Sequence, residues 1–184
     1  MAKAIEGSLL SALRGQIGKQ LVVRRTRHGA VVSAFPARSG AERTAAQKAH
    51  QERFRRAALY AKGAQARPEY IAAAKKRGST PFNVATGDFL HPPEIKRIQL
   101  AKYRGTAGDV IEVVALDDVL VTAVTVTLAT GGGELIEQGP ATRSGTHQAL
   151  WVYTATQDAP AGPVKVTVQA SDLAGNVTSA EAER

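Results

Sequence analysis

The stretch Val124-Thr-Val-Thr-Leu128 lies inside a β-favouring run over residues 119–130 and alternates apolar with polar side chains. A second stretch, Val164-Lys-Val-Thr-Val168, repeats the same alternation further along the chain. On a strand, a period of two places one row of side chains inward and the other outward. Both stretches therefore predict half-buried strands with one apolar face.

Short runs of the same kind fill the C-terminal half, and Gly- and Asp-containing turns such as Gly131-Gly-Gly133 separate them. Strands at intervals of about ten residues are typical of an antiparallel sandwich. Trp151 and Tyr153 are two residues apart, so they share a face, and Trp151 is a natural core anchor. The seven predicted strands are residues 95–103, 110–116, 119–130, 134–138, 149–155, 164–170 and 176–179.

Three segments of this half carry a family resemblance. They are Gly108-Asp-Val-Ile-Glu-Val-Val-Ala115, Trp151-Val-Tyr-Thr-Ala155 and Val166-Thr-Val-Gln-Ala-Ser-Asp-Leu-Ala-Gly-Asn176. Together they resemble a bacterial immunoglobulin-like (Ig-like or fibronectin III-like) domain, and the closing Asp-x-Ala-Gly-Asn segment is the most specific part. The resemblance does not extend to residues 1–94. It implies a spacer, adhesive or assembly module that seldom carries catalytic residues.

The N-terminal half begins with an arm that Gly7, Gly15 and Gly18 interrupt, and we expect this arm to be irregular. Residues 19–26 and 30–35 are two β-favouring runs around Arg27-His-Gly29, which predicts a hairpin with Gly29 in its loop. Two strands alone are marginally stable in water. The hairpin is therefore expected to pack on the following helices, the second domain or another subunit.

Helical signals follow the hairpin. Ser39-Gly-Ala-Glu42 fits a capping box, which predicts a helix from there to about Lys62 with Gly63 as its stop. Pro68 is expected to open a second helix that ends at Lys75-Lys-Arg-Gly78, and Thr80-Pro81 a third. His91-Pro-Pro93 is expected to end the third helix and serve as a linker.

We therefore expect an α+β protein with two domains: residues 1–93, a basic arm, hairpin and two or three short helices, and residues 94–184, a seven-stranded Ig-like sandwich. Charge supports this division. Residues 1–105 contain 21 Lys and Arg against 6 Asp and Glu, a net charge of +15. Residues 106–184 contain 3 against 10, a net charge of −7. Such a step suggests two modules with different partners.

The search for chemistry finds no catalytic constellation. The four histidines are far apart in sequence, and with no cysteine the chain has no thiol nucleophile and no thiolate metal site. Asp117-Asp118 is read as an inter-strand turn, with a calcium-binding loop as the alternative that stays open. Gly131-Gly-Gly133 lacks the Lys-Ser/Thr of a phosphate loop. We expect no enzyme, cofactor, metal or small-molecule substrate.

The basic residues are the candidate interaction site. They fall on the hairpin and on two helices, and an excess of +15 is too large to serve only solubility. The candidates, for binding another subunit or a polyanion, are Arg24, Arg25, Arg27, Arg53, Arg55, Arg56, Lys75, Lys76 and Arg77.

Our first functional expectation is a non-enzymatic structural protein that self-assembles into a homo-oligomer or polymer. It would be a repeated subunit of a filament, tube, sheath or phage-like particle, joined through the basic N-terminal module. Opposite charges on the two halves would favour head-to-tail contacts, which form rings or open filaments. The alternative is a nucleic-acid-binding protein whose sandwich recruits another protein. A surface adhesin is a third and weaker hypothesis.

Location is predicted from the N-terminus and from hydropathy. Glu6, Arg14 and Lys19 interrupt the apolar residues of 1–21, so a secretory signal is not expected. We expect synthesis in the cytoplasm without a signal peptide, with a final location there or in an exported or phage-like assembly. No apolar run is long enough to predict a membrane-spanning helix.

Overall fold

The computed structural model describes residues 2–3, 14–26, 29–35, 42–145 and 149–184. By their internal contacts the residues form two compact units, Met1–Thr44 and Ala45–Arg184. This division places the three helices in one unit with the sandwich, whereas the expected linker at His91-Pro-Pro93 and the strand pattern that follows it placed a boundary between residues 93 and 94. The reason is that the helices pack against loops of the sandwich, as shown below.

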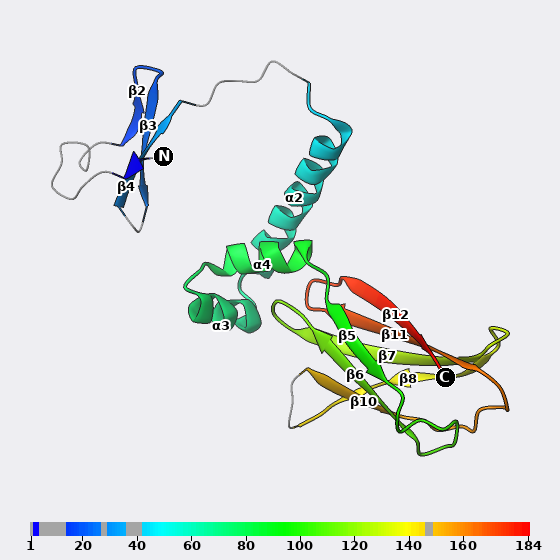
Figure 1. Ribbon diagram of the computed structural model, residues 1–184. Coiled ribbons are helices and arrows are strands. Elements are labelled where there is room, and N and C mark those ends of the chain that lie inside the picture. The colour runs from blue at the N-terminus through cyan, green and yellow to red at the C-terminus, as the bar shows by residue number, and fades with distance from the viewer. Residues whose placement is uncertain (1, 4–13, 27–28, 36–41, 146–148) are drawn as a thin grey trace. The chain divides into compact units, whose positions relative to one another are not determined.

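The N-terminal unit is a four-stranded antiparallel sheet in the order β1-β4-β3-β2 (Figure 1). Its strands are β1 (Ala2–Lys3), β2 (Gly15–Ile17), β3 (Leu21–Thr26) and β4 (Gly29–Ala34). The predicted hairpin is present as β3 and β4, whose register runs from Leu21 opposite Ala34 to Thr26 opposite Gly29. Gly29 has a φ of 111°, a conformation that favours glycine.

The expectation of an irregular arm is wrong for two segments of it, because β1 and β2 pair with the outer edges of the hairpin. The chain itself thus supplies the extra strands that a marginal hairpin requires. Among the described residues of this sheet, Val23 and Ala30 are buried, while Ile17, Leu21 and Phe35 remain about 40% exposed. Its core is therefore thin.

Three helices open the second unit: α2 (Ala45–Ala64), α3 (Pro68–Arg77) and α4 (Pro81–Leu90). The predictions for α3 and α4 are confirmed, since each has its proline in the first turn and Thr80 caps α4 by accepting from the Asn83 N–H at 3.2 Å. Two expectations for α2 are wrong. The helix begins at Ala45, so a cap at Ser39, outside the described residues, does not start it, and it continues through Gly63.

The rest of the unit is a β-sandwich of two four-stranded antiparallel sheets. One sheet has the order β5-β6-β10-β9, and the other β12-β11-β7-β8. The strands are β5 (Glu94–Gln99), β6 (Val110–Leu116), β7 (Val121–Thr130), β8 (Leu135–Pro140), β9 (Thr142–Arg143), β10 (Leu150–Thr154), β11 (Val164–Asp172) and β12 (Val177–Glu183). The expected count of seven strands omitted β9, whose two residues pair with β10 but are too few to show a period.

The predicted alternation builds the core between the two sheets. Val124, Val126 and Leu128 of β7 are at most 1% exposed, and they meet inward-facing residues of β6, β10 and β11 in one cluster. Trp151 (5% exposed) and Tyr153 (4% exposed) share the inner face of β10, as predicted. The strands are thus held by burial of one apolar face from each sheet.

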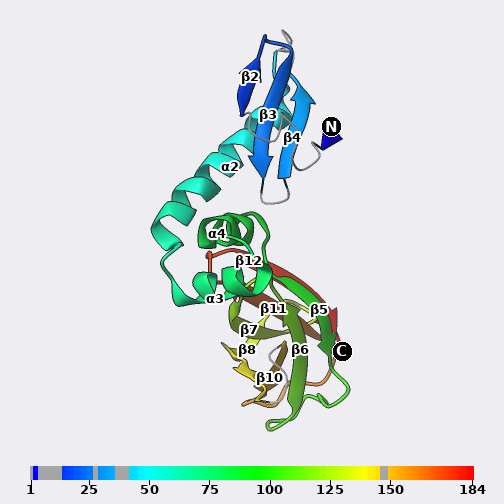
Figure 2. The same cartoon turned by 90° about the vertical axis from the view of Figure 1, so that its left-hand side faces the viewer.

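The helices lie at one end of the sandwich, and both views place α3 and α4 beside the loops there (Figures 1 and 2). A second, small cluster joins them: Ala61, Ala64, Tyr70, Ala74, Val84 and Ala85 are buried together. Val119 and Leu173, from two loops of the sandwich, pack against this cluster. The cluster contains few large side chains, so polar contacts contribute a larger share of the interactions that hold the helices on the sandwich.

Candidate functional site at the helix–sandwich junction

The basic residues singled out by the sequence fall into three groups. Arg24 and Arg25 lie on β3 of the N-terminal unit and are exposed, while Arg27 lies outside the described residues. Arg24 stands opposite Val31 and Arg25 opposite Ala30 in the hairpin register. The positions of the two units relative to each other are not determined, so this group is described by itself.

The second group lies on α2, and its members bind neighbours within the chain. Arg53 donates to the Leu90 carbonyl at 2.6 Å. Arg55 makes two hydrogen bonds of 2.9 Å to the Glu52 carboxylate, and Arg56 reaches the same group at 3.4 Å. The hydrogen bond from Arg55 is the main influence that lowers the pKa of Glu52. These exposed ion pairs contribute little to stability.

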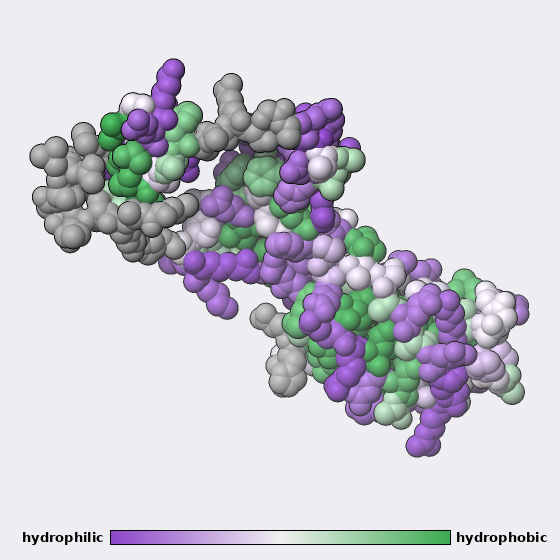
Figure 3. Space-filling model, turned by 45° about the horizontal axis from the view of Figure 1, so that its top comes forward, coloured by the Kyte–Doolittle hydropathy of each residue, from purple (hydrophilic) through white to green (hydrophobic). Residues whose placement is uncertain are grey.

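The third group, Lys75, Lys76 and Arg77, occupies the last turn of α3, where positive charge offsets the partial negative charge of a helix C-terminus. Arg77 also donates to the Asp118 carbonyl, in the loop between β6 and β7. Figure 3 shows hydrophilic side chains distributed over much of the visible surface. Within the second unit, the predicted residues thus lie in two separate groups, one on α2 and one on α3. Arg53 and Arg77 make hydrogen bonds to other segments that help to position these helices.

The most elaborate polar arrangement centres on Asp88, a residue that sequence reasoning missed. Asp88 lies on α4 and is 0% exposed. The Tyr70 hydroxyl donates to its Oδ2 at 2.6 Å, and the Tyr60 hydroxyl lies 2.8 Å from that of Tyr70. Tyr60 also donates to the Leu173 carbonyl at 3.1 Å. These bonds connect all three helices to one loop of the sandwich.

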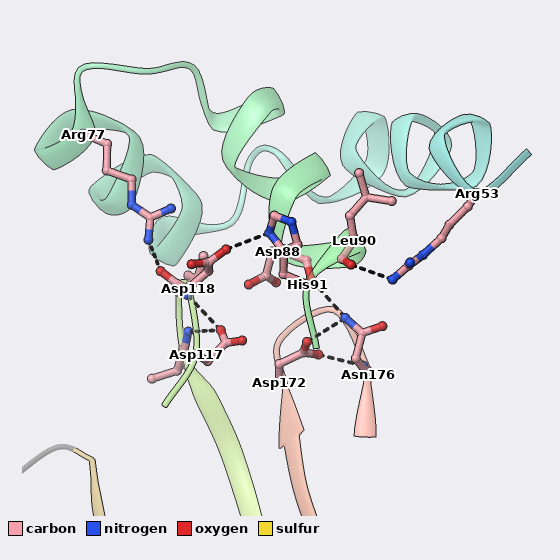
Figure 4. Close-up of polar contacts among 11 residues, drawn as sticks. Arg53, Arg77, Asp88, Leu90, His91, Asp117, Asp118, Asp172 and Asn176 are labelled. Carbon is pink, nitrogen blue, oxygen red and sulfur yellow. Dashed lines mark hydrogen bonds and ion pairs between the residues drawn. The ribbon is translucent and has the colours of Figure 1, made fainter. Parts of the chain in front are cut away.

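The Asp-x-Ala-Gly-Asn segment reaches Asp88 from the other side (Figure 4). Asp172 is 4% exposed; its Oδ1 accepts the Asn176 backbone N–H at 2.7 Å, and its Oδ2 accepts the Asn176 side-chain amide at 2.7 Å. The same amide donates to the Asp88 carbonyl at 3.0 Å. The segment that carried the family resemblance therefore also holds α4 on the sandwich.

Asp117 and Asp118 complete the junction from the loop between β6 and β7. Asp117 Oδ2 accepts the backbone N–H groups of Val119 and Leu120, each at 2.8 Å, which is the turn conformation expected from the sequence. Asp118 Oδ2 lies 3.0 Å from Nδ1 of His91. Among the described residues, no group of three or more His, Asp or Glu side chains is arranged to hold a metal ion.

The electrostatics of the junction are dominated by Asp88. Burial raises the pKa of Asp88 to about 7; the Tyr70 hydroxyl opposes this rise, and the carboxylates of Asp117 and Asp172 add to it. Burial also raises the pKa of Tyr70, followed by its bond to Asp88, so Tyr70 remains a hydrogen-bond donor. The arrangement is a junction between the helices and the sandwich, built from all three helices and two loops of the sandwich.

Comparison with known proteins assigns no family. No protein-family model matches the chain, and no curated protein matches it. Among solved structures, CopC from Methylosinus trichosporium OB3b is similar with a TM-score of 0.38 and 11% identity, over 50% of this chain and 90% of that one. An engineered protein has a TM-score of 0.38 and 20% identity, over 50% of this chain and 19% of that chain. The description as a β-sandwich therefore rests on the strand pairing and core given above.

Within the described part of the chain, no helix combines the length and the apolar character needed to cross a membrane.

Proposed function

We propose that this chain is a non-enzymatic structural protein that associates with further copies of itself through its N-terminal half. The observation that carries the proposal is the exposure of α2. All residues from 45 to 56 are exposed except Glu52, which is half-buried, and the helix packs on α4 through buried alanines in its second half. About three turns of helix that bury so little apolar surface are marginally stable in water.

The helix also carries exposed apolar side chains. Phe54 is 50% exposed, and Leu59, five residues further along α2, is 72% exposed. A second copy is the occupant that the charge distribution favours, because residues 1–105 carry +15 and residues 106–184 carry −7. A head-to-tail contact between the two would repeat and form rings or filaments.

The sandwich, in this proposal, is a bacterial Ig-like module that is displayed or that receives the next copy. The Asp172–Asn176 turn supports this finer assignment, because the residues that resemble the family make the hydrogen bonds of a tightly closed turn. Gly175 within it has a φ of 90°, which favours the glycine of the segment.

Self-association is tested by sedimentation velocity and electron microscopy of the full chain over a range of concentrations. We expect the average mass to grow with concentration, and we expect F54S/L59S to stay monomeric because its α2 surface is polar. The control I71S changes an apolar residue that is 49% exposed on α3 and should associate like the wild type. A wild-type chain that stays monomeric at its highest soluble concentration contradicts the proposal.

A polyanion is the second candidate partner, favoured by the net charge of +15 over residues 1–105. It predicts that a DNA or RNA gel shift seen at about 50 mM salt weakens steeply by about 200 mM, because bound cations are released from phosphates. K75A/K76A should weaken the shift, whereas K165A, on the sandwich and paired with Glu181, should not. Absence of any shift at the lower salt concentration removes this candidate.

A further inference from the structure

We propose that Asp88 and Asp117 share a single proton, and that loss of this proton as the pH rises loosens the helices from the sandwich. The two side chains come from different layers: Asp88 from α4 and Asp117 from the loop between β6 and β7. Asp117 is a close enough neighbour of Asp88 to raise the pKa of Asp88, both as a negative charge and as an adjacent carboxyl. In Figure 4, Asp88 faces the two segments of the sandwich that carry Asp117 and Asp172.

The hydrogen bonds of Asp88 and Asp117 use one oxygen of each carboxyl and leave the other without a partner, so one proton can be shared between them. Asp88 Oδ2 accepts from Tyr70, and Asp117 Oδ2 accepts from two backbone N–H groups. The other oxygen of each carboxyl, Asp88 Oδ1 and Asp117 Oδ1, is buried and has no hydrogen-bond partner. Two ionised carboxylates would leave both oxygens unsatisfied and repel each other, whereas one proton between them converts the contact into a hydrogen bond.

The groups that surround Asp88 favour retention of that proton. From α3, Tyr70 faces it as a donor, and from α2, Tyr60 supports Tyr70. From β11, the Asp172 carboxylate acts on Asp88 as a second negative charge. Further out lie the His91–Asp118 pair and two arginines, Arg67 and Arg77, that donate to the backbone carbonyls of Leu173 and Asp118.

The direction of the pH effect follows from the folded and unfolded pKa values. An ordinary aspartate has a pKa of 3.8, and burial raises the pKa of Asp88 to about 7 in the folded chain. The folded form therefore binds the proton more tightly, so the proton stabilises the junction fully below the unfolded pKa. This stabilisation declines as the pH rises and is lost above about 7.

The experiment is hydrogen exchange of the full chain between about pH 5 and pH 8, read over α3 and α4 after correction for the intrinsic exchange rate. We expect the equilibrium for opening these helices to rise by up to about tenfold per pH unit until about pH 7. D88N should remove this rise, because an amide mimics the protonated acid: its N–H₂ donates to Asp117 and its oxygen accepts from Tyr70. D117N should remove it as well, since an amide there donates to an ionised Asp88.

Two controls separate this effect from a general change of charge. D109N removes a carboxylate whose pKa is lowered by backbone N–H groups of Thr106 and Arg104, so it should leave the rise intact. H91N removes the imidazole of the neighbouring exposed pair with Asp118 and should also leave it intact. A rise that survives in D88N, or that disappears in H91N, overturns the proposal.

A second measurement does not depend on the variants folding. Carboxyl carbon chemical shifts of the wild-type chain should show Asp88 titrating near pH 7. If Asp88 instead titrates near the ordinary value of an aspartate, no proton is shared. Added Ca²⁺ or Mg²⁺ at about pH 8 should not slow exchange in α3 and α4. Slower exchange that EDTA reverses would show that the two carboxyls hold a metal ion instead of a proton, and would likewise overturn the proposal.

Discussion

Replacing Tyr70 by alanine is expected to lower the stability of the helices by about 3–5 kcal/mol, the cost typical of truncating a buried aromatic side chain. Tyr70 is 0% exposed, and the other buried members of its cluster are alanines and Val84. It therefore supplies much of the apolar surface that holds α2, α3 and α4 together. Its hydroxyl also donates to the buried Asp88, so the variant loses both the packing and a hydrogen bond.

The measurement is hydrogen exchange together with far-UV circular dichroism during denaturation. Exchange in α3 and α4 should accelerate much more than exchange in β7 and β11, whose core is a separate cluster. I71A is the matched control, because Ile71 follows Tyr70 on the same helix and is 49% exposed. Equal protection of the helices in Y70A and I71A would show that the junction does not depend on Tyr70.

Replacing Leu128 by alanine is expected to lower the free energy of unfolding of the sandwich by about 2–5 kcal/mol. Leu128, on β7, is 0% exposed and pairs with Val166 on β11 and Glu137 on β8. The packed neighbours from both sheets leave little freedom for the core to close around the cavity. The loss therefore includes both the transfer of the side chain and the cavity that remains.

Chemical denaturation measures this effect, and the same substitution at an exposed site provides the control. Leu135 lies on β8 of the same sheet and is 60% exposed, so L135A should change the free energy of unfolding by no more than about 0.5 kcal/mol. A similar loss from both variants would mean that Leu128 is not a core residue.

Agreement between sequence and structure is closest where the signal is local. The alternation in β7 and β11 predicted both strands and their inward faces, because adjacent side chains of a strand point to opposite sides. Thr80-Pro81 predicted the start of α4 for a similar reason, since a cap and a first-turn proline act within one helical turn. The α2 start was misplaced because Ser39 and Glu42 have the spacing of a cap without being followed directly by the helix.

Contacts between segments that are far apart in the chain have no comparable local signal in the sequence. Ala2 stands opposite Val32 and Gln16 opposite Val22, so the arm joins the hairpin through backbone bonds that any side chain can accompany. Asp88 stands between Gly87 and Phe89 in a stretch that gives no indication of a buried carboxyl. The basic residues were visible as charge and were assigned to a hairpin and two helices, but the contacts of Arg53 with Leu90 and of Arg77 with Asp118 join segments far apart in the sequence.

By itself, the sequence determined seven of the eight described strands of the sandwich, the hairpin, two of the helices and the uneven distribution of charge, because each depends on neighbours within a few residues. Only the tertiary structure decided that Tyr70, Asp88, Asp117 and Asp172 meet at one junction. A carboxyl acquires a raised pKa when other segments remove water from it and place further carboxyls beside it, and those segments come together only in the folded chain.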